Sequence, residues 1–130
     1  MKNKSIVIIC GDPKSTFNEI LIKTLNKKLH NKLKYSIILV CSKKIFGNEL
    51  KEFKAKIKVQ NFKIGKNLIK NNIYILDVPL DIKNLSLKKK NIYIKRSFEI
   101  GLNLLKDNNS LALINGPISK KTFLQKKKLG

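Results

Sequence analysis

The sequence has no tryptophan, one arginine, one histidine and two cysteines among its 130 residues. Two cysteines without a CxxC motif are too few for a disulfide framework, so we expect Cys10 and Cys41, both in apolar runs, to be buried free thiols. His30, in "KKLHNK", falls at the expected end of a helix and is typical of a solvated residue there. With so few candidate ligands, the sequence supplies neither a zinc site nor a Ser-His-Asp constellation.

Long apolar runs and nucleotide-binding fingerprints are also missing. The longest apolar runs, "IVIIC" and "IILVC", are far shorter than the roughly 18 residues of a membrane span. No cleavable signal sequence stands at the N-terminus, and neither GxGxxG nor GxxxxGK[ST] is present. These absences indicate a cytoplasmic protein without a membrane segment, a common dinucleotide fingerprint or a P-loop.

Positive charge is abundant, with a formal net charge of +21. Such a charge is typical of nucleic-acid binding, but Arg96 is the only arginine, and arginine is the better residue for bidentate contacts to bases and phosphates. The lysines are scattered along the chain, and the runs 88–90 and 126–128 are most simply solvated surface. We therefore do not expect specific binding of nucleic acid.

The apolar pattern alternates between strands and helices. Continuous apolar runs predict strands, and residues repeating at helical spacing predict helices between them. The expected strands are 5–10, 35–41, an edge strand within 56–62, 72–79 and 110–115, and the expected helices are 16–29, 46–53, 94–105 and 119–128. Thr16 and Glu19 form a plausible capping box, and "LDIKNLSLKKKN" is the one linker-like segment. The pattern predicts a single α/β domain around a largely parallel sheet with helices on both faces.

Two expected strands end in similar turns, Gly11-Asp12-Pro13 and Asn115-Gly116-Pro117. In an open parallel sheet, ligands bind beyond the carboxyl ends of the strands, so we expect both turns at one edge of the sheet. Glycine lets the backbone approach a ligand, proline suits the first turn of a helix, and the free N–H groups there can hold a phosphate. Lys120 could add a positive charge nearby. Either turn alone is more typical of an ordinary strand-to-helix connection.

Together, "IICGDPKSTFNEILIKTL" and "SFEIGLNLLKDNNSLALINGPISKKTFLQKKKLG" resemble the 4-hydroxythreonine-4-phosphate dehydrogenase family of pyridoxal phosphate biosynthesis. That family opens with a strand and a Gly-Asp/Glu-Pro turn. It later has a helix, a short strand, a Thr/Asn-Gly/Ala-Pro turn and a lysine three residues after the proline. The resemblance covers essentially all of residues 1–130, although the middle matches only in its strand-helix pattern.

The sequence departs from the family pattern in two places. Residues 14–18 replace the family's glycines and second proline, which puts the identity of the substrate in question. The His-Thr pair and the three metal-binding histidines of the family have no counterpart here. We therefore expect the chain to be an N-terminal fragment or a truncated product that is inactive alone.

The resemblance implies a truncated fold like that of isocitrate and isopropylmalate dehydrogenases. It also implies an NAD- or NADP-dependent oxidation of a small phosphorylated hydroxy acid, assisted by a divalent metal (Zn, Mg or Co), and a homodimer at full length. The site would be lined by Gly11, Asp12, Pro13, Asn115, Gly116, Pro117 and Lys120. Two alternatives stay open, namely a small basic α/β module that binds RNA or other anions, and a catalytically dead homologue.

Overall fold

The computed structural model describes residues 4–13, 15–27, 34–65, 67–106 and 110–116. Within these residues one sheet holds five strands, which are β1 (Ser5–Ile9), β2 (Ser36–Cys41), β3 (Val59–Asn61), β4 (Ile73–Asp77) and β5 (Ser110–Asn115). The spatial order is β3-β4-β2-β1-β5, and every neighbouring pair is parallel. The expected parallel α/β sheet is therefore confirmed.

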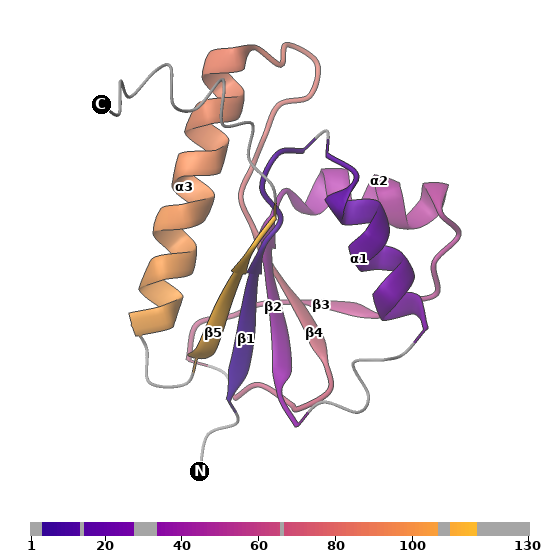
Figure 1. The fold of residues 1–130 in the computed structure, drawn as a ribbon, viewed down its shortest axis with the longest axis vertical. Helices are drawn as coiled ribbons and strands as arrows, with labels where there is room; N and C mark the ends of the chain where they lie inside the picture. Colours follow the sequence, from indigo (N-terminus) through magenta and orange to yellow (C-terminus); the bar gives the residue numbers. More distant parts are fainter. Residues whose placement is uncertain (1–3, 14, 28–33, 66, 107–109, 117–130) are drawn as a thin grey trace.

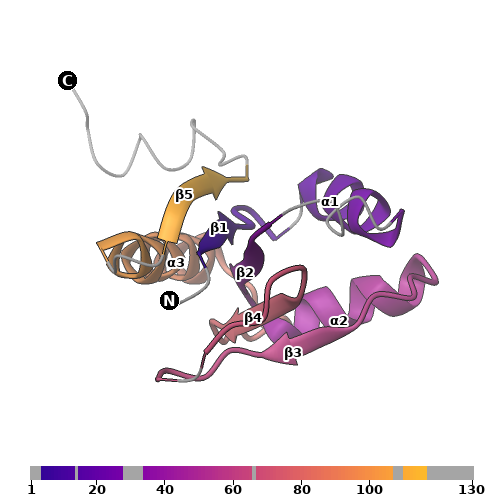
Figure 2. The ribbon, with the colours of Figure 1, turned by 90° about the horizontal axis from the view of Figure 1, so that it is seen from below.

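Helices cover both faces of the sheet, as Figures 1 and 2 show. On one face lie α1 (Phe17–Asn26) and α2 (Lys43–Glu52), and on the other lies α3 (Leu87–Lys106). The side chains of β1 alternate between two cores, with Ile8 packed in the α1/α2 core and Val7 and Ile9 in the α3 core. Because both faces are covered, the central strands are apolar throughout, which explains why their sequences show no alternation.

Close packing of α3 depends on Gly101. A Cβ atom at this position would lie 2.5 Å from Ile9 Cδ1 and 3.1 Å from Leu113 Cδ1. Because Gly101 has no side chain, the axis of α3 can approach β1 and β5 closely.

Three details differ from the expectations. Thr16 makes no side-chain capping bond, so the predicted capping box is wrong; instead Ser15 Oγ accepts from the Phe17 N–H at 3.3 Å, and Glu19 lies 3.8 Å from Lys23. The expected linker contains the first turn of α3, which begins at Leu87 because Ser86 Oγ caps the Lys89 N–H.

The third difference concerns β3, which is an edge strand as expected but has only three residues.

None of the helices in the described ranges is both long and apolar enough to cross a bilayer. The expected helix over residues 119–128 and His30 lie outside the described residues.

Candidate functional site

The two glycine turns meet at the topological switch point of the sheet, where the connections between strands change from one face of the sheet to the other. From β1 the chain passes through α1 to β2, whereas from β4 it passes through α3 across the other face to β5, on the far side of β1. Ile9 pairs with Asn115, so the carboxyl ends of β1 and β5 are level. The prediction that both turns lie at one edge is confirmed for Gly11, Asp12, Pro13, Asn115 and Gly116. Pro117 and Lys120 lie outside the described residues.

Backbone contact joins the two turns directly. The Gly116 N–H donates to the Ile9 carbonyl at 2.6 Å. A Cβ atom on Gly116 would collide with the Cys10 carbonyl oxygen and would lie 2.8 Å from Phe17 Cδ2. Gly11 has φ +75°, a left-handed conformation that glycine adopts without steric cost. The close contact at Gly116 and the left-handed backbone at Gly11 thus both favour glycine at this edge of the sheet.

An ion pair connects the first turn to α3. Lys90 Nζ lies 3.5 Å from Asp12 Oδ2, and the two side chains are only 20% and 14% exposed. The expectation that residues 88–90 are all solvated surface is therefore wrong for Lys90. Its neighbour Asn91 has a buried side-chain nitrogen without a hydrogen-bond partner. This part of α3 thus brings a cation and a spare donor to the same end of the helix.

Two side chains hold the start of α2 at the end of β2. Ser42 is the N-cap and accepts from the Ile45 N–H at 3.3 Å, while Asp77 Oδ1 accepts from the Lys43 N–H at 2.8 Å. The Ser42 N–H donates to the hydroxyl of Tyr93, which reaches over from α3, at 2.7 Å. Burial, followed by the nearby Cys41, raises the pKa of Tyr93 far above its ordinary value, so the phenol is neutral.

Asn18 and Glu49 link α1 to α2 near the same edge. Asn18 is 3% exposed and donates through Nδ2 to Glu49 Oε1 at 2.8 Å, while its buried Oδ1 has no hydrogen-bond partner. Burial raises the pKa of Glu49 above its ordinary value of 4.5, an effect that the Asn18 hydrogen bond opposes and the charge of Glu52 reinforces. The folded state therefore favours the protonated carboxyl.

We expect Glu49→Gln to flatten the pH dependence of stability. Below pH 4.5 the carboxyl is protonated in both states, and as the pH rises through the raised pKa the folded state loses stability relative to the unfolded chain. The amide keeps the acceptor for Asn18 but carries no charge, so the variant should gain less than about 1 kcal/mol over the parent at pH 7. Urea unfolding at pH 4 to 8 measures this.

The matched control for this prediction is Glu99→Gln, at an exposed position of α3. It should unfold with the same pH dependence as the parent. A Glu49→Gln profile that falls as steeply as that of the parent would contradict the role assigned to burial of this carboxyl.

The described residues do not provide a metal centre. No group of three or more His, Cys, Asp or Glu side chains converges within them. They suit an anion better, because the cation Lys90 lies beside the Gly11 turn, where the lack of a side chain allows a close backbone approach.

Two hollows lie apart from the two glycine turns. A hollow of about 390 Å³ opens beside β3, at the opposite side of the sheet from β5, and its lining includes Gln60, Asn61 and Tyr74. A second, of about 230 Å³, lies between α2 and β3 and is mostly apolar. Neither includes a residue that the sequence analysis assigned to the site.

The geometry thus defines a parallel α/β protein whose candidate site is a pair of glycine turns at a switch point. Its fold matches part of the fold of 4-hydroxythreonine-4-phosphate dehydrogenases, an isocitrate dehydrogenase-like fold. A solved structure from Salmonella typhimurium, provisionally assigned to that activity, matches with a TM-score of 0.74 at 15% identity, over 97% of this chain and 41% of that one. A 4-hydroxythreonine-4-phosphate dehydrogenase from Burkholderia phymatum matches with a TM-score of 0.65 at 16% identity, over 94% and 38%.

The chain therefore spans about two-fifths of the length of the solved proteins it matches. No protein-family model and no curated protein matches the sequence. At these sequence identities the structural similarity establishes the fold alone. This fold agrees with the family resemblance noted in the sequences around the two turns.

Lys90, Tyr93 and Asp77 also lie at this edge, although the sequence pattern did not single them out. The signal for Asp77 was available, because an acidic residue directly after an apolar strand stands where it can reach the start of a neighbouring helix. The sequence pattern does not distinguish Lys90 and Tyr93 from the other residues of a lysine-rich helix. Only the packing of α3 shows that these two side chains point toward the carboxyl edge.

Proposed function

We propose that this chain forms the N-terminal portion of an NAD- or NADP-dependent dehydrogenase that acts on 4-phosphohydroxy-L-threonine or a related phosphorylated hydroxy acid. The oxidation yields a β-keto acid that decarboxylates, in the synthesis of pyridoxal 5'-phosphate. The observation that carries the proposal is the meeting of the Gly11 and Gly116 turns at the β1–β5 switch point, in a fold matched over 97% of the chain.

In this proposal the carboxyl edge binds the anionic end of the substrate. The Gly11 turn allows a close approach of the backbone, and Lys90 supplies a positive charge that Asp12 holds in place. Asn115 and Pro13 line the edge in this proposal, and Pro117 and Lys120 are expected to join them, Lys120 with a second positive charge. The bound nicotinamide would accept the hydride. In the proposed enzyme, residues outside this chain would provide the ligands of the divalent metal. The enzyme would be a cytoplasmic homodimer.

Substitutions of Lys90 and of Asp12, the two members of the ion pair, are expected to change the affinity for the phosphorylated substrate in opposite directions. Lys90→Met removes the cation, so the dissociation constant for 4-phosphohydroxy-L-threonine should rise about 3- to 10-fold. Asp12→Asn removes the competing carboxylate and leaves Lys90 free for the ligand, so the constant should fall about 2- to 5-fold. Isothermal titration of the 130-residue chain at 50 mM salt measures both.

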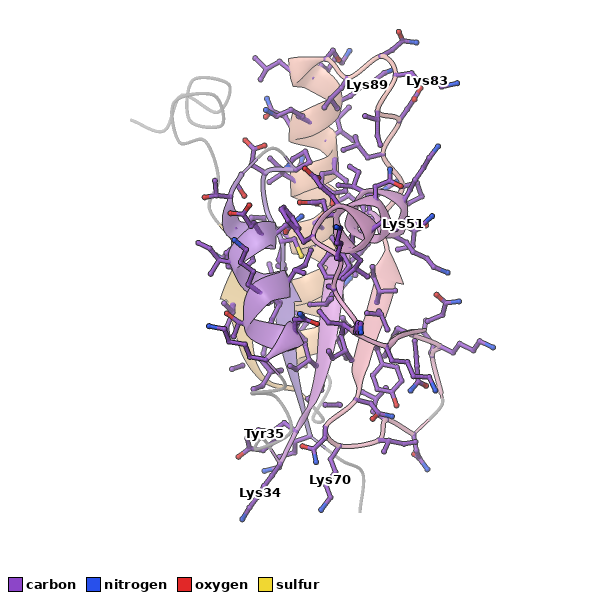
Figure 3. All side chains as sticks on the ribbon, turned by 90° about the vertical axis from the view of Figure 1, so that its right-hand side faces the viewer. Lys34, Tyr35, Lys51, Lys70, Lys83 and Lys89 are labelled. Carbon is purple, nitrogen blue, oxygen red and sulfur yellow. The ribbon has the colours of Figure 1, made fainter. Side chains whose placement is uncertain are left out.

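Lys70→Met is the matched control, because Lys70 is exposed and lies at the opposite end of the strands (Figure 3). It should bind the ligand as the parent does. Equal losses for Lys90→Met and Lys70→Met would show that binding follows general charge, and would remove the ion pair from the proposed site.

A second candidate function, a basic module that binds RNA or other anions, is favoured by the net charge of +21. Figure 3 shows lysines at both ends of the sheet, with Lys34 and Lys70 at one end and Lys83 and Lys89 at the other. Binding through such scattered lysines should fall about 10³-fold or more between 50 and 200 mM salt. A polyuridine oligonucleotide that keeps its affinity across this range would exclude this candidate, as would the absence of binding at 50 mM.

A further inference from the structure

The two cysteines of the chain occupy matching positions on neighbouring strands. Ile9 pairs with Val40 in the register of β1 and β2, so Cys10 stands opposite Cys41 one residue further along. The Cys10 N–H donates to the Val40 carbonyl at 3.3 Å, which shows that the pairing of the two strands extends to this position. Among 130 residues, the only two thiols are thus placed on the same rung of the sheet.

Their side chains also face the same way. Cys10 and Cys41 are each 2% exposed and belong to the core beneath α1 and α2. The neighbouring Cys10 thiol and burial together raise the pKa of Cys41 well above its ordinary value. Neighbouring strands lie about 4.7–4.9 Å apart, within the roughly 4.4–6.8 Å of Cα separation that a disulfide spans, so the backbone need not move far to allow a bond.

We propose that Cys10 and Cys41 form an intramolecular disulfide when the folded protein meets a small thiol oxidant such as a diazene or a low-molecular-weight disulfide. With a diazene, one cysteine adds to the N=N bond, and the second thiolate then attacks the sulfur of the adduct. Both S–H bonds are broken, one S–S bond forms, and two electrons and two protons pass to the oxidant, which leaves as the hydrazine. With a disulfide as oxidant, two thiols are released instead.

The surroundings set the rate and the consequence of this reaction. The neighbouring Cys10 thiol, and then burial, raise the pKa of Cys41, so the folded protein reacts more slowly than an exposed cysteine. Once formed, the bond would fasten the residue before the Gly11 turn to the residue before Ser42, the N-cap of α2. Oxidation would therefore tie the first turn of the candidate site to a neighbouring helix.

The test is to treat the purified protein with diamide, alkylate it in denaturant and weigh the intact chain. The expected product is a monomer 2 Da lighter, with both alkylation sites lost together and one peptide pair linking Cys10 to Cys41. Dithiothreitol should restore both thiols. Cys10→Ala and Cys41→Ala each remove one partner, and neither should form the lighter monomer.

Wild-type protein unfolded in urea serves as the control for the oxidant, which must consume its thiols in the same time. If the folded chain keeps two alkylatable thiols after prolonged treatment while the unfolded chain loses them, the proposal is wrong. Conversion of the folded chain into disulfide-linked dimers alone, or into a species with two separate oxidant adducts, would also contradict it. None of these results depends on the proposed dehydrogenase function.

Discussion

Replacing Gly116 with alanine is expected to lower the free energy of unfolding by about 2–4 kcal/mol. The new methyl group would meet the Cys10 carbonyl oxygen, which is backbone and cannot rotate away, and the ring of Phe17. Relief requires β5 to move away from β1, which weakens the 2.6 Å hydrogen bond from the Gly116 N–H to the Ile9 carbonyl. Urea unfolding followed by circular dichroism measures the loss.

Gly47→Ala provides the matched control. Gly47 lies within α2, and apart from its chain neighbours and the backbone of its own helix no atom lies within 4 Å of the position that its Cβ would occupy. Alanine is the better helix former, so this variant should gain roughly 0.5–1 kcal/mol. A Gly116→Ala variant as stable as the parent would show that the two turns are not packed together as described.

Tyr93→Phe is expected to cost about 1–3 kcal/mol of stability, although only one oxygen atom is removed. The Tyr93 hydroxyl accepts from the buried Ser42 N–H at 2.7 Å, and phenylalanine would leave that donor without this bond. The start of α2 and the end of β2 should loosen first, because Ser42 connects them. Hydrogen exchange of the Ser42 and Ile45 amides would locate the effect, alongside urea unfolding for its size.

The control for this prediction is Tyr74→Phe. The Tyr74 hydroxyl also accepts from a backbone N–H, that of Ile69, at 2.9 Å, but this bond is only partly buried. Water can replace the lost acceptor there, so the cost should be below about 1 kcal/mol. Equal effects of the two substitutions would contradict the importance given to the buried contact between α3 and the start of α2.

The sequence predicts the order of strands and helices because the periodicity is strong in each segment. Continuous apolar runs marked β1 and β2, and the turns at Gly11 and Gly116 marked the ends of β1 and β5. The edge position of β3 followed from its alternating lysines. Placement of both turns at one edge then follows from the rule that the carboxyl ends of parallel strands share an edge.

Features that depend on packing between distant segments could not be predicted. Thr16 and Glu19 have the spacing of a capping box, yet Ser15 Oγ accepts from the Phe17 N–H in place of Thr16, and Glu19 pairs with Lys23 instead. Lys90 is one of three consecutive lysines, and only the position of α3 against the Asp12 turn distinguishes it. The pairing of Cys10 with Cys41 likewise needs the register of β1 and β2, which the sequence does not fix. The roles of Pro117 and Lys120 stay predictions.

The central claim is that the edge formed by the two glycine turns binds a phosphorylated hydroxy acid. A titration of ¹⁵N-labelled protein with 4-phosphohydroxy-L-threonine at 150 mM salt tests it most directly, because the backbone amides of Gly11, Asp12 and Gly116 report on each turn separately. We expect saturable shifts of these three amides with a common dissociation constant, while the amide signals of Lys70 and Gly47 do not shift. Shifts confined to exposed lysines across the chain, or to residues of the hollow beside β3, would contradict it.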